Sequence, residues 1–257
     1  MTQPNSPFSL EDYVIHHVQN SNQWHLPFLP PVDLPGLLSL HGLMLLLCAL
    51  GLIGIFCGLY KKSQLVPTGL TNFLEMIVVL IRDHVAIAWL GEKDGRKMTP
   101  LFCTFFFFIL GMNLMGLIPL FTSPTTNINV TGALAFITFS FMFFGAIYKN
   151  GFGGFFKALV PPGIPWPLVV LLFPIEFLGV FIKALALMIR LFVNLLAGHI
   201  VILSLLGLVI VLGIVALPAV FLAVFIYILE ILVAFLQAYI FILLSAIFIG
   251  QLYHPQH

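Results

Sequence analysis

The stretch Ala186-Leu-Met-Ile-Arg-Leu-Phe-Val-Asn-Leu-Leu-Ala-Gly-His199 places an arginine, Arg190, inside an apolar region that runs from Leu168 to Gly250. An arginine cannot lose its charge, and insertion scales put its cost near the centre of a bilayer at about 2.5–3.5 kcal/mol. The same region holds four other charged or histidine side chains: Glu176, Lys183, His199 and Glu230. Ionisable groups at membrane depth mark ion paths. We therefore expect this region to form the stationary part of such a path.

The composition is that of an integral membrane protein. Hydrophobic residues make up 61% of the 257 residues and charged residues only 7%, whereas a soluble domain is about 25% charged. A net charge of +1 argues against nucleic acid as a partner. The three cysteines have no metal-ligand spacing, and the chain has no G-x-x-x-x-G-K-S/T loop. We expect no metal, no cofactor and no nucleotide-binding site on this chain.

Apolar runs long enough to cross a hydrocarbon core of about 30 Å predict an all-α membrane protein. Three such runs lie before residue 150, at 37–60, 100–120 and 131–148. Beyond residue 168 the sequence allows two interpretations. One has three spans, near 168–188, 195–217 and 219–250. The other has two long helices that meet between Gly207 and Gly213, and these would have to tilt or bend because of their length.

Segment 69–90 differs from the spans because it is amphipathic. Its apolar residues recur at helical spacing, while polar and charged residues occupy the other positions. The pattern predicts a helix that lies along the inner membrane surface or packs against a partner.

The distribution of lysine and arginine predicts the orientation. Six of the ten lie between the first two spans and two more follow the third, at Lys149 and Lys157. By the positive-inside rule, both loops face the cytoplasm. The polar tail, residues 1–36, then lies on the outer side, ahead of a transmembrane domain at 37–257. With two further crossings the C-terminus is cytoplasmic.

On a helix, Glu176, Lys183 and Arg190 share one face, because each lies seven residues after the last. Asn194 follows Arg190 by four residues on the same face. His199 lies nine residues after Arg190, roughly on the opposite face and about 13 Å further along the axis. In the last span two more polar residues are seven apart, Glu230 and Gln237. The titratable groups are thus offset on either side of Arg190, and this charge calls for a carboxylate from another subunit.

These residues lie in motifs that are specific to one family. Leu185 to His199 contains Arg-Leu-Phe, then Asn194, then Ala-Gly before a titratable residue, and 236–241 reads Leu-Gln-Ala-Tyr-Ile-Phe. Both stretches resemble motifs of subunit a of the F-type ATP synthase, the Fo stator subunit, also called the subunit 6 family. Segments 12–17, 113–119 and 126–131 are similar to the same family. The resemblance covers nearly the whole chain and favours about five transmembrane helices, the last two long and tilted.

The resemblance implies a role for each candidate residue. Arg190 would face a carboxylate of the rotor and separate two aqueous half-channels, with Gln237 and Asn194 close by. His199 and Glu230 would line the outer half-channel, in the exchanged arrangement also seen in mitochondrial relatives. Glu176 would belong to the inner half-channel. Lys183 would join it there or reach to the inner surface as an anchor.

The family also implies partners and a location. The expected partners are the c-ring, the peripheral-stalk subunit b, other ATP synthase subunits and membrane lipid. The expected location is a bacterial inner membrane, with a mitochondrial inner membrane as the alternative. The chain would serve as a subunit of a proton-translocating ATP synthase, with nucleotide chemistry on other subunits.

Three positions depart from the family pattern, and three other readings stay open. Ala186 stands where many relatives carry a serine. Gly116 and Asn127 stand where many relatives carry an aspartate, so the outer half-channel would use Asn113, Asn127, Asn129 and His199 with water. Arg190 could instead be structural, paired with Glu176 or Glu230 inside a bundle. The chain could also be a stand-alone transporter or channel, or a purely structural anchor of the stator.

Overall fold

The computed structural model describes residues 23–24, 32–33, 39–59, 69–118, 121–160 and 164–254. Apart from one two-residue antiparallel pair, β1 (Gln23–Trp24) and β2 (Val32–Asp33), its regular elements are helical. Five stretches of helix are long and apolar enough to cross a membrane. The prediction of an all-α membrane protein with about five transmembrane helices is confirmed. Most of the predicted polar tail, 1–36, lies outside the described residues.

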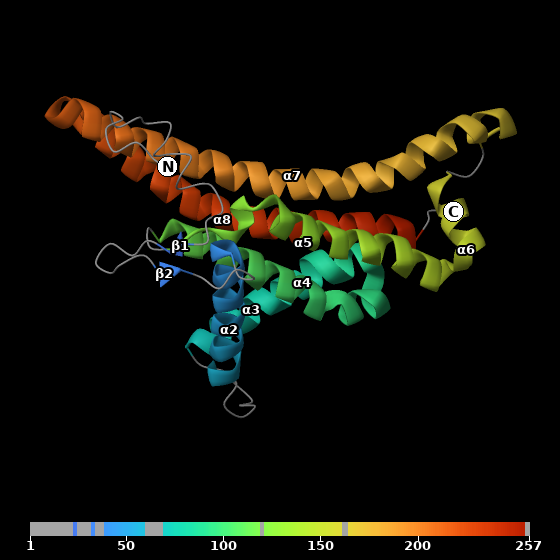
Figure 1. The fold of residues 1–257 in the computed structure, drawn as a ribbon. Helices are drawn as coiled ribbons and strands as arrows, with labels where there is room; N and C mark the ends of the chain where they lie inside the picture. Colours follow the sequence, from blue (N-terminus) through green and yellow to red (C-terminus); the bar gives the residue numbers. More distant parts are fainter. Residues whose placement is uncertain are drawn as a thin grey trace.

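Two long antiparallel helices follow residue 165 (Figure 1). Helix α7 (Trp166–Leu212) has 47 residues and α8 (Leu217–Tyr253) has 37, so they are about 70 and 56 Å long at 1.5 Å per residue. Both exceed a hydrocarbon core of about 30 Å, so they have to tilt or bend within it. Gly213, at φ 58°, ends α7 with a conformation that glycine adopts without strain. The two-helix interpretation is therefore right, and the three-span interpretation is wrong.

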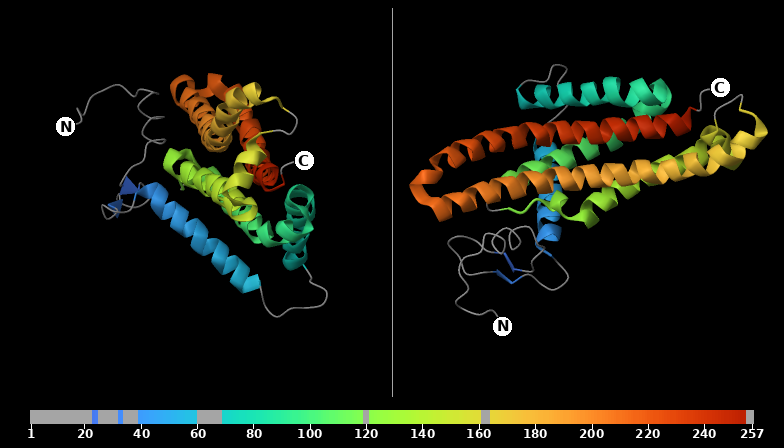
Figure 2. Two further views of the ribbon diagram at one scale, coloured as in Figure 1. Left: turned by 90° about the vertical axis from the view of Figure 1, so that its right-hand side faces the viewer. Right: turned by 90° about the horizontal axis from the view of Figure 1, so that it is seen from above.

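Helices α4 (Ala88–Leu117) and α5 (Ile128–Ser140) run alongside the α7–α8 pair. Helix α2 (Leu40–Leu59) crosses the direction of these helices and packs against α4 (Figures 1 and 2). A π-helical turn joins α5 to α6 (Ala146–Leu159). The third predicted span, 131–148, thus starts too late and ends too early, because the helical path covers 128–159 with a kink at Gly151.

The amphipathic segment forms a helix that folds back on α4. Helix α3 (Leu70–Leu80) continues through a π-helical turn, Ile81–Ile87, whose apolar side chains are buried. The chain reverses at Gly91, at φ 77°, and then approaches itself so closely that a Cβ on Gly95 would lie 2.7 Å from the Ala86 carbonyl oxygen. The predicted helix is present, and within this chain its buried side packs on α4.

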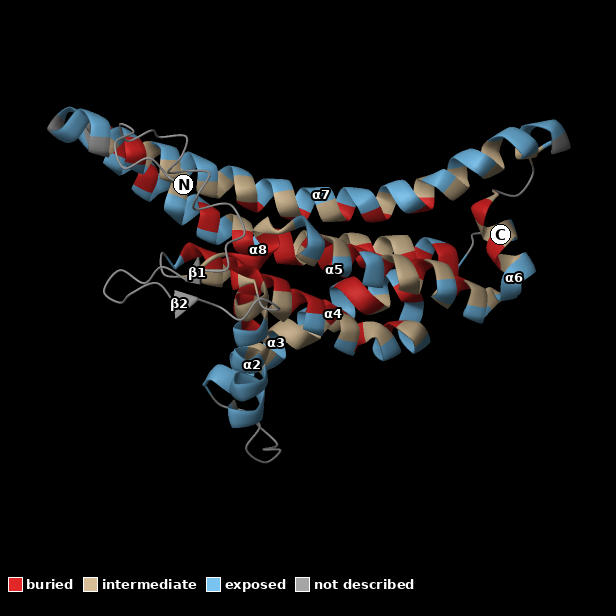
Figure 3. Cartoon of the chain, in the orientation of Figure 1, coloured by how far each residue is buried: buried red, intermediate tan, exposed pale blue. Residues whose placement is uncertain are grey.

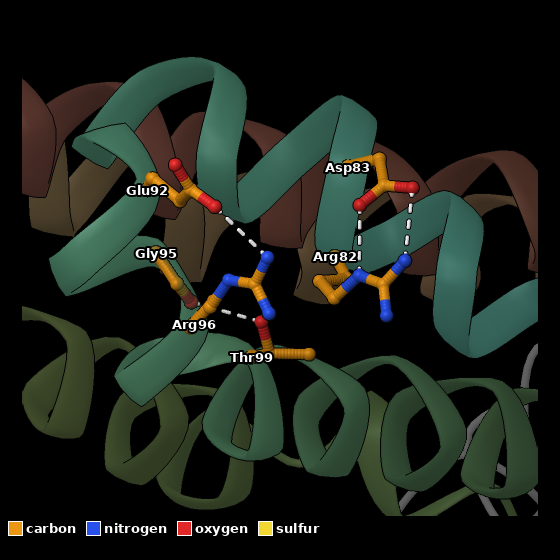
Figure 4. A network of polar contacts seen from close by, with 6 residues as sticks. All are labelled: Arg82, Asp83, Glu92, Gly95, Arg96 and Thr99. Atoms are coloured by element: carbon orange, nitrogen blue, oxygen red, sulfur yellow. Dashed lines mark hydrogen bonds and ion pairs between the residues drawn. The ribbon is translucent and has the colours of Figure 1, made fainter.

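The polar side of this hairpin carries short-range ion pairs (Figure 4). The Arg82 guanidinium donates to the Asp83 carboxylate at 2.8 Å, and Arg96 donates to Glu92 at 2.9 Å. The segment 93–97, which lies in the predicted loop between the first two spans, is instead part of α4. Gly91 adopts the positive φ that the sharp turn before this segment requires, and Pro100 lies within the helix that follows.

A narrow buried stripe holds α7 against its neighbours, while much of α7 is exposed (Figure 3). The stripe recurs every three or four residues, at Val180, Ala184, Leu187, Leu191 and Leu195. On α8 the buried residues include Glu230, Gln237 and Ser245 among small and apolar ones. The interface between α7 and α8 therefore contains buried polar side chains within apolar packing.

Candidate ion path between α7 and α8

Arg190 lies on α7 beside the buried stripe, and its side chain is exposed. No ion pair or hydrogen bond joins it to another residue in the described part of the chain, and Glu176 and Glu230 are both described. The reading in which Arg190 is paired with one of these carboxylates is therefore wrong for this structure. Five N–H donors of a permanent cation stay available to a partner outside the chain.

A hydrogen bond between α7 and α8 lies one turn from Arg190. The Asn194 amide nitrogen donates to Gln237 Oε1 at 3.1 Å. Because Asn194 follows Arg190 by four residues, Gln237 lies within about 6 Å of the arginine along the helix axis. Gln237 Nε2 is buried and has no hydrogen-bond partner among the described residues. The structure thus brings the three predicted residues together and leaves two of them with unused donors.

Glu230 and His199 meet at the same interface, further along α7. The Glu230 side chain is only 5% exposed and rests against Gly198, where an added Cβ would lie 2.3 Å from Glu230 Oε1. His199 is the next residue of α7, and its Nε2 is buried. Neither carboxylate oxygen of Glu230, nor His199 Nε2, has a partner in the described part of the chain. Two groups that can exchange protons therefore lie close together with their polar atoms unused.

On the other side of Arg190, Lys183 connects α7 to the C-terminal end of α8. Its ammonium donates to Gln251 Oε1 at 2.9 Å and lies 5.6 Å from the ring centroid of Phe248. Glu176 is seven residues earlier on α7 and is half-buried. It forms no ion pair with Lys183 or any other described residue. The structure places Glu176 on the predicted helix, about 21 Å before Arg190 along the axis, without bringing the two together.

A cluster of buried hydroxyl and amide groups lies where α4 ends and α5 begins. Thr125 donates to Asn113 Oδ1 at 2.9 Å, and the hydroxyls of Ser123 and Thr125 are 2.7 Å apart. Asn113 Nδ2 is buried and has no partner among the described residues. Of the other predicted outer residues, Asn127 caps α5 by accepting from the backbone N–H of Asn129 at 2.9 Å.

The sequence reasoning named Asn113 but missed the hydroxyls that hold it. The sequence feature that could have revealed these hydroxyls is the run Ser-Pro-Thr-Thr at 123–126 between two apolar spans. Hydroxyl residues beside proline favour turns in which the side chain bonds to the backbone. It also missed His41, a buried residue in the first turn of α2 whose Nε2 lies 3.4 Å from Thr126 Oγ1.

The register between α4 and α8 relates this cluster to Glu230. The rings of Phe105 and Phe241 are 5.7 Å apart, and the Tyr227 hydroxyl donates to the Leu117 carbonyl at 2.8 Å. The two helices are therefore antiparallel, with position 105 level with 241 and position 117 level with 227. Interpolation puts Asn113 within about one turn of Glu230 along the helices.

Comparison with known proteins identifies the family of the chain. The sequence profile described as "ATP synthase A chain" matches residues 42–250. The chain is 46% identical over 215 residues to ATP synthase subunit a of Anaeromyxobacter dehalogenans (strain 2CP-C), which covers 82% of this chain and 56% of the relative. It is 44% identical over 260 residues to the subunit of Chloroherpeton thalassium, covering 95% of this chain and 77% of the relative.

A third relative, ATP synthase subunit a of Myxococcus xanthus, is 40% identical over 260 residues, with 91% of this chain and 85% of the relative covered. The chain thus spans about half the length of the Anaeromyxobacter relatives and most of the length of the other two. The profile match and the 40% or higher identity over most of the chain lead to one assignment. This multi-pass membrane protein belongs to the ATP synthase A chain family, whose curated members are ATP synthase subunits a.

Proposed function

We propose that this chain is the stator subunit of the membrane sector of an F-type ATP synthase, and that it couples proton translocation to rotation of a c-ring. The observation that carries the proposal is the unpaired, exposed Arg190 at the edge of the α7–α8 interface. A permanent charge in a membrane needs compensation. None comes from the described part of the chain, so we assign it to a neighbouring subunit.

The donors around Arg190 define the chemistry of that neighbour. Among the described residues, neither the Arg190 guanidinium nor Gln237 Nε2 has a hydrogen-bond partner, and both are donors. An ionised carboxylate accepts only, and arginine binds it through two parallel hydrogen bonds. A protonated carboxyl group loses most of this attraction and can leave. Arg190 therefore attracts a rotor carboxylate when it is ionised and releases it when it carries a proton.

Arg190 also separates two groups of polar residues. Glu230 and His199 lie on one side, and Glu176 and Lys183 lie on the other. We assign the first pair to the outer half-channel and the second to the inner half-channel. A positive charge between them repels a free proton, so a proton crosses only on a rotor carboxylate. The driving field supplies about 2.3 kcal/mol per charge for each 100 mV.

The proposed orientation follows from the positive charges. Lys149 and Lys157, together with most other lysines and arginines, lie in segments assigned to the cytoplasmic side. The C-terminus is then cytoplasmic and the N-terminal end of α2 is outside. The three relatives compared here are bacterial, which supports a bacterial inner membrane. The proposed partners are the c-ring, the peripheral-stalk subunit b and the remaining subunits, which perform the nucleotide chemistry.

Proton flux in liposomes distinguishes this function from that of a stand-alone transporter or channel. The purified chain is reconstituted alone and, in parallel, as the complete membrane sector with its ring, and proton flux is driven by a potassium diffusion potential. The proposal predicts flux only with the ring. Flux through the purified chain alone, with the same ion selectivity as the complete sector, would contradict it.

A further inference from the structure

His41 is a buried titratable residue to which the proposed path has given no role. Its side chain is 2% exposed, in line with Met44 and Cys48 on the face of α2 that packs against α4. A histidine is unusual on an apolar helix face, because a buried polar group that lacks a hydrogen bond destabilises the fold. His41 is directed at Thr126, in the turn between α4 and α5.

The hydrogen bonds at Thr126 fix which group donates. The Thr126 hydroxyl donates to the Ser123 carbonyl at 2.7 Å, so its oxygen has to accept from His41 Nε2, at 3.4 Å. Nε2 therefore carries a proton, and the imidazole can take up a second proton on Nδ1 and release one from Nε2. His41 is thus connected to the hydroxyl cluster through a proton-bearing atom.

The opposite end of the cluster is directed towards the proton path. Ser123 and Thr125 connect Thr126 to Asn113, whose Nδ2 is a buried donor without a partner in the described part of the chain. Asn113 lies level with Glu230, and both oxygens of Glu230 are likewise buried without a partner. Polar groups of this kind hold bridging water in protein interiors. The cluster provides a polar route from α2 to Glu230.

The described segments of α4 and of the turn after it that lie near His41 carry no charged side chain. No charged or titratable side chain occurs at 112–117 on α4 or at 124–126, the two segments that pack against the first turn of α2. Tyr227 of α8 reaches this region through its hydroxyl, which donates to the Leu117 carbonyl.

We propose that His41 is a proton-exchanging residue of the outer half-channel that precedes Glu230 in the path, and that it passes protons through water beside the 113–126 hydroxyl and amide cluster to Glu230. This inference rests on the proposed function, which assigns Glu230 to the outer half-channel and the N-terminal end of α2 to the outside. It adds a protonatable residue, at the first turn of α2, to a path otherwise formed by α7 and α8.

The test measures the outer-pH dependence of proton conduction in membrane vesicles that carry the complete complex. His41→Gln keeps a polar side chain of similar size but removes the titration, and His41→Ala opens a site that free imidazole can enter. Ser39→Ala is the matched control, because it alters the same turn: Ser39 Oγ accepts from the Gly42 N–H at 3.3 Å. Assembly of each complex is checked in detergent, and Arg190→Ala is measured beside them.

His41→Gln is expected to slow conduction about a hundredfold, because positioned proton-transfer groups contribute about 10²–10⁴-fold. It is also expected to remove a step from the outer-pH profile, and added imidazole is expected to restore the rate of His41→Ala. A buried histidine with a purely structural role would not respond to imidazole. An unchanged pH profile in the assembled His41→Gln complex overturns the proposed role of His41. If Arg190→Ala still abolishes coupling in the same assay, the proposed function remains intact. Retained coupling in Arg190→Ala overturns the proposed function itself.

Discussion

Gly198 of α7 and Glu230 of α8 are in direct contact, and a Cβ at residue 198 would lie 2.3 Å from Glu230 Oε1 and 3.0 Å from its Cδ. Real Cβ atoms do not approach other atoms so closely, so only glycine admits the carboxylate at this point of α7. The contact places Glu230 beside His199, the next residue of the chain. The outer proton site thus requires a glycine at position 198 as well as its two titratable groups.

The first prediction concerns this contact. Gly198→Ala should force the Glu230 carboxylate away from α7 and slow ATP-driven proton pumping by about ten- to a hundredfold, because small misplacements of reacting groups have effects of that size. The matched control is Gly179→Ala on the same helix, whose Cβ would meet Glu176 Oε2 at an ordinary 4.0 Å. Pumping is measured in vesicles with an assembled complex. Equal rates in the two variants would show that the position of Glu230 has no influence.

The second prediction concerns the turn that reverses α3 onto α4. Gly91 has φ 77° and ψ 169°, a region that side-chain-bearing residues rarely enter. Gly91→Ala should lower the free energy of unfolding by about 1–3 kcal/mol. The control is Gly153→Ala in α6, where a Cβ would meet nothing within 4 Å. Thermal unfolding of the purified protein in detergent measures both, and an undiminished midpoint for Gly91→Ala contradicts the strain argument.

The third prediction concerns the amide pair beside Arg190. A double-mutant cycle with Asn194→Ala and Gln237→Ala should give a coupling of about 0.6 kcal/mol, the mean for hydrogen bonds between transmembrane helices. Gln237→Ala should also slow proton pumping more than Asn194→Ala, since it removes the unused donor, Gln237 Nε2. Unfolding in mixed detergent gives the coupling and vesicle assays give the rates. The opposite order of rates would exclude a role for Gln237 in binding the rotor carboxylate.

The fourth prediction concerns an ion pair at the C-terminal end of α8. Lys149 of α6 pairs with Asp94 of α4, with side chains 26% and 24% exposed, and also lies 3.0 Å from His254 Nε2. Asp94→Asn should lower stability by up to about 1 kcal/mol at low salt and by less at high salt. The exchanged double variant, Asp94→Lys with Lys149→Asp, should recover part of the loss. Thermal midpoints at two salt concentrations check this, and a loss that does not depend on salt would point to packing instead.

The sequence predicts the membrane class and the principal site because both depend on local chemistry. Arg190, Asn194 and Gln237 stand out as polar residues in apolar runs, and the structure brings them to one level of the α7–α8 interface. The position of the turn could not be read in the same way. Hydrophobicity hardly changes between residues 168 and 250, and it is the backbone at Gly213 that ends α7.

Features that depend on long-range packing were missed for a related reason. Segment 93–97 is rich in charge and lies in the predicted loop between the first two spans, yet it is helical. Its helix is held by α3, which folds back on it, and by the ion pair of Asp94 with Lys149, 55 residues later. His41 gave no signal as a lone histidine, since its partner Thr126 lies 85 residues away. Pairings over such distances come from the fold and not from spacing along a helix.

The most direct test of the central claim is ATP-driven proton uptake, together with passive proton leak, in membranes that carry Arg190→Ala in a complex shown to be assembled. The account predicts that pumping is lost and that the leak rises, because Arg190 binds the rotor carboxylate and blocks a continuous proton path. Normal pumping with an unchanged leak would contradict it and would leave the chain as a structural anchor of the stator.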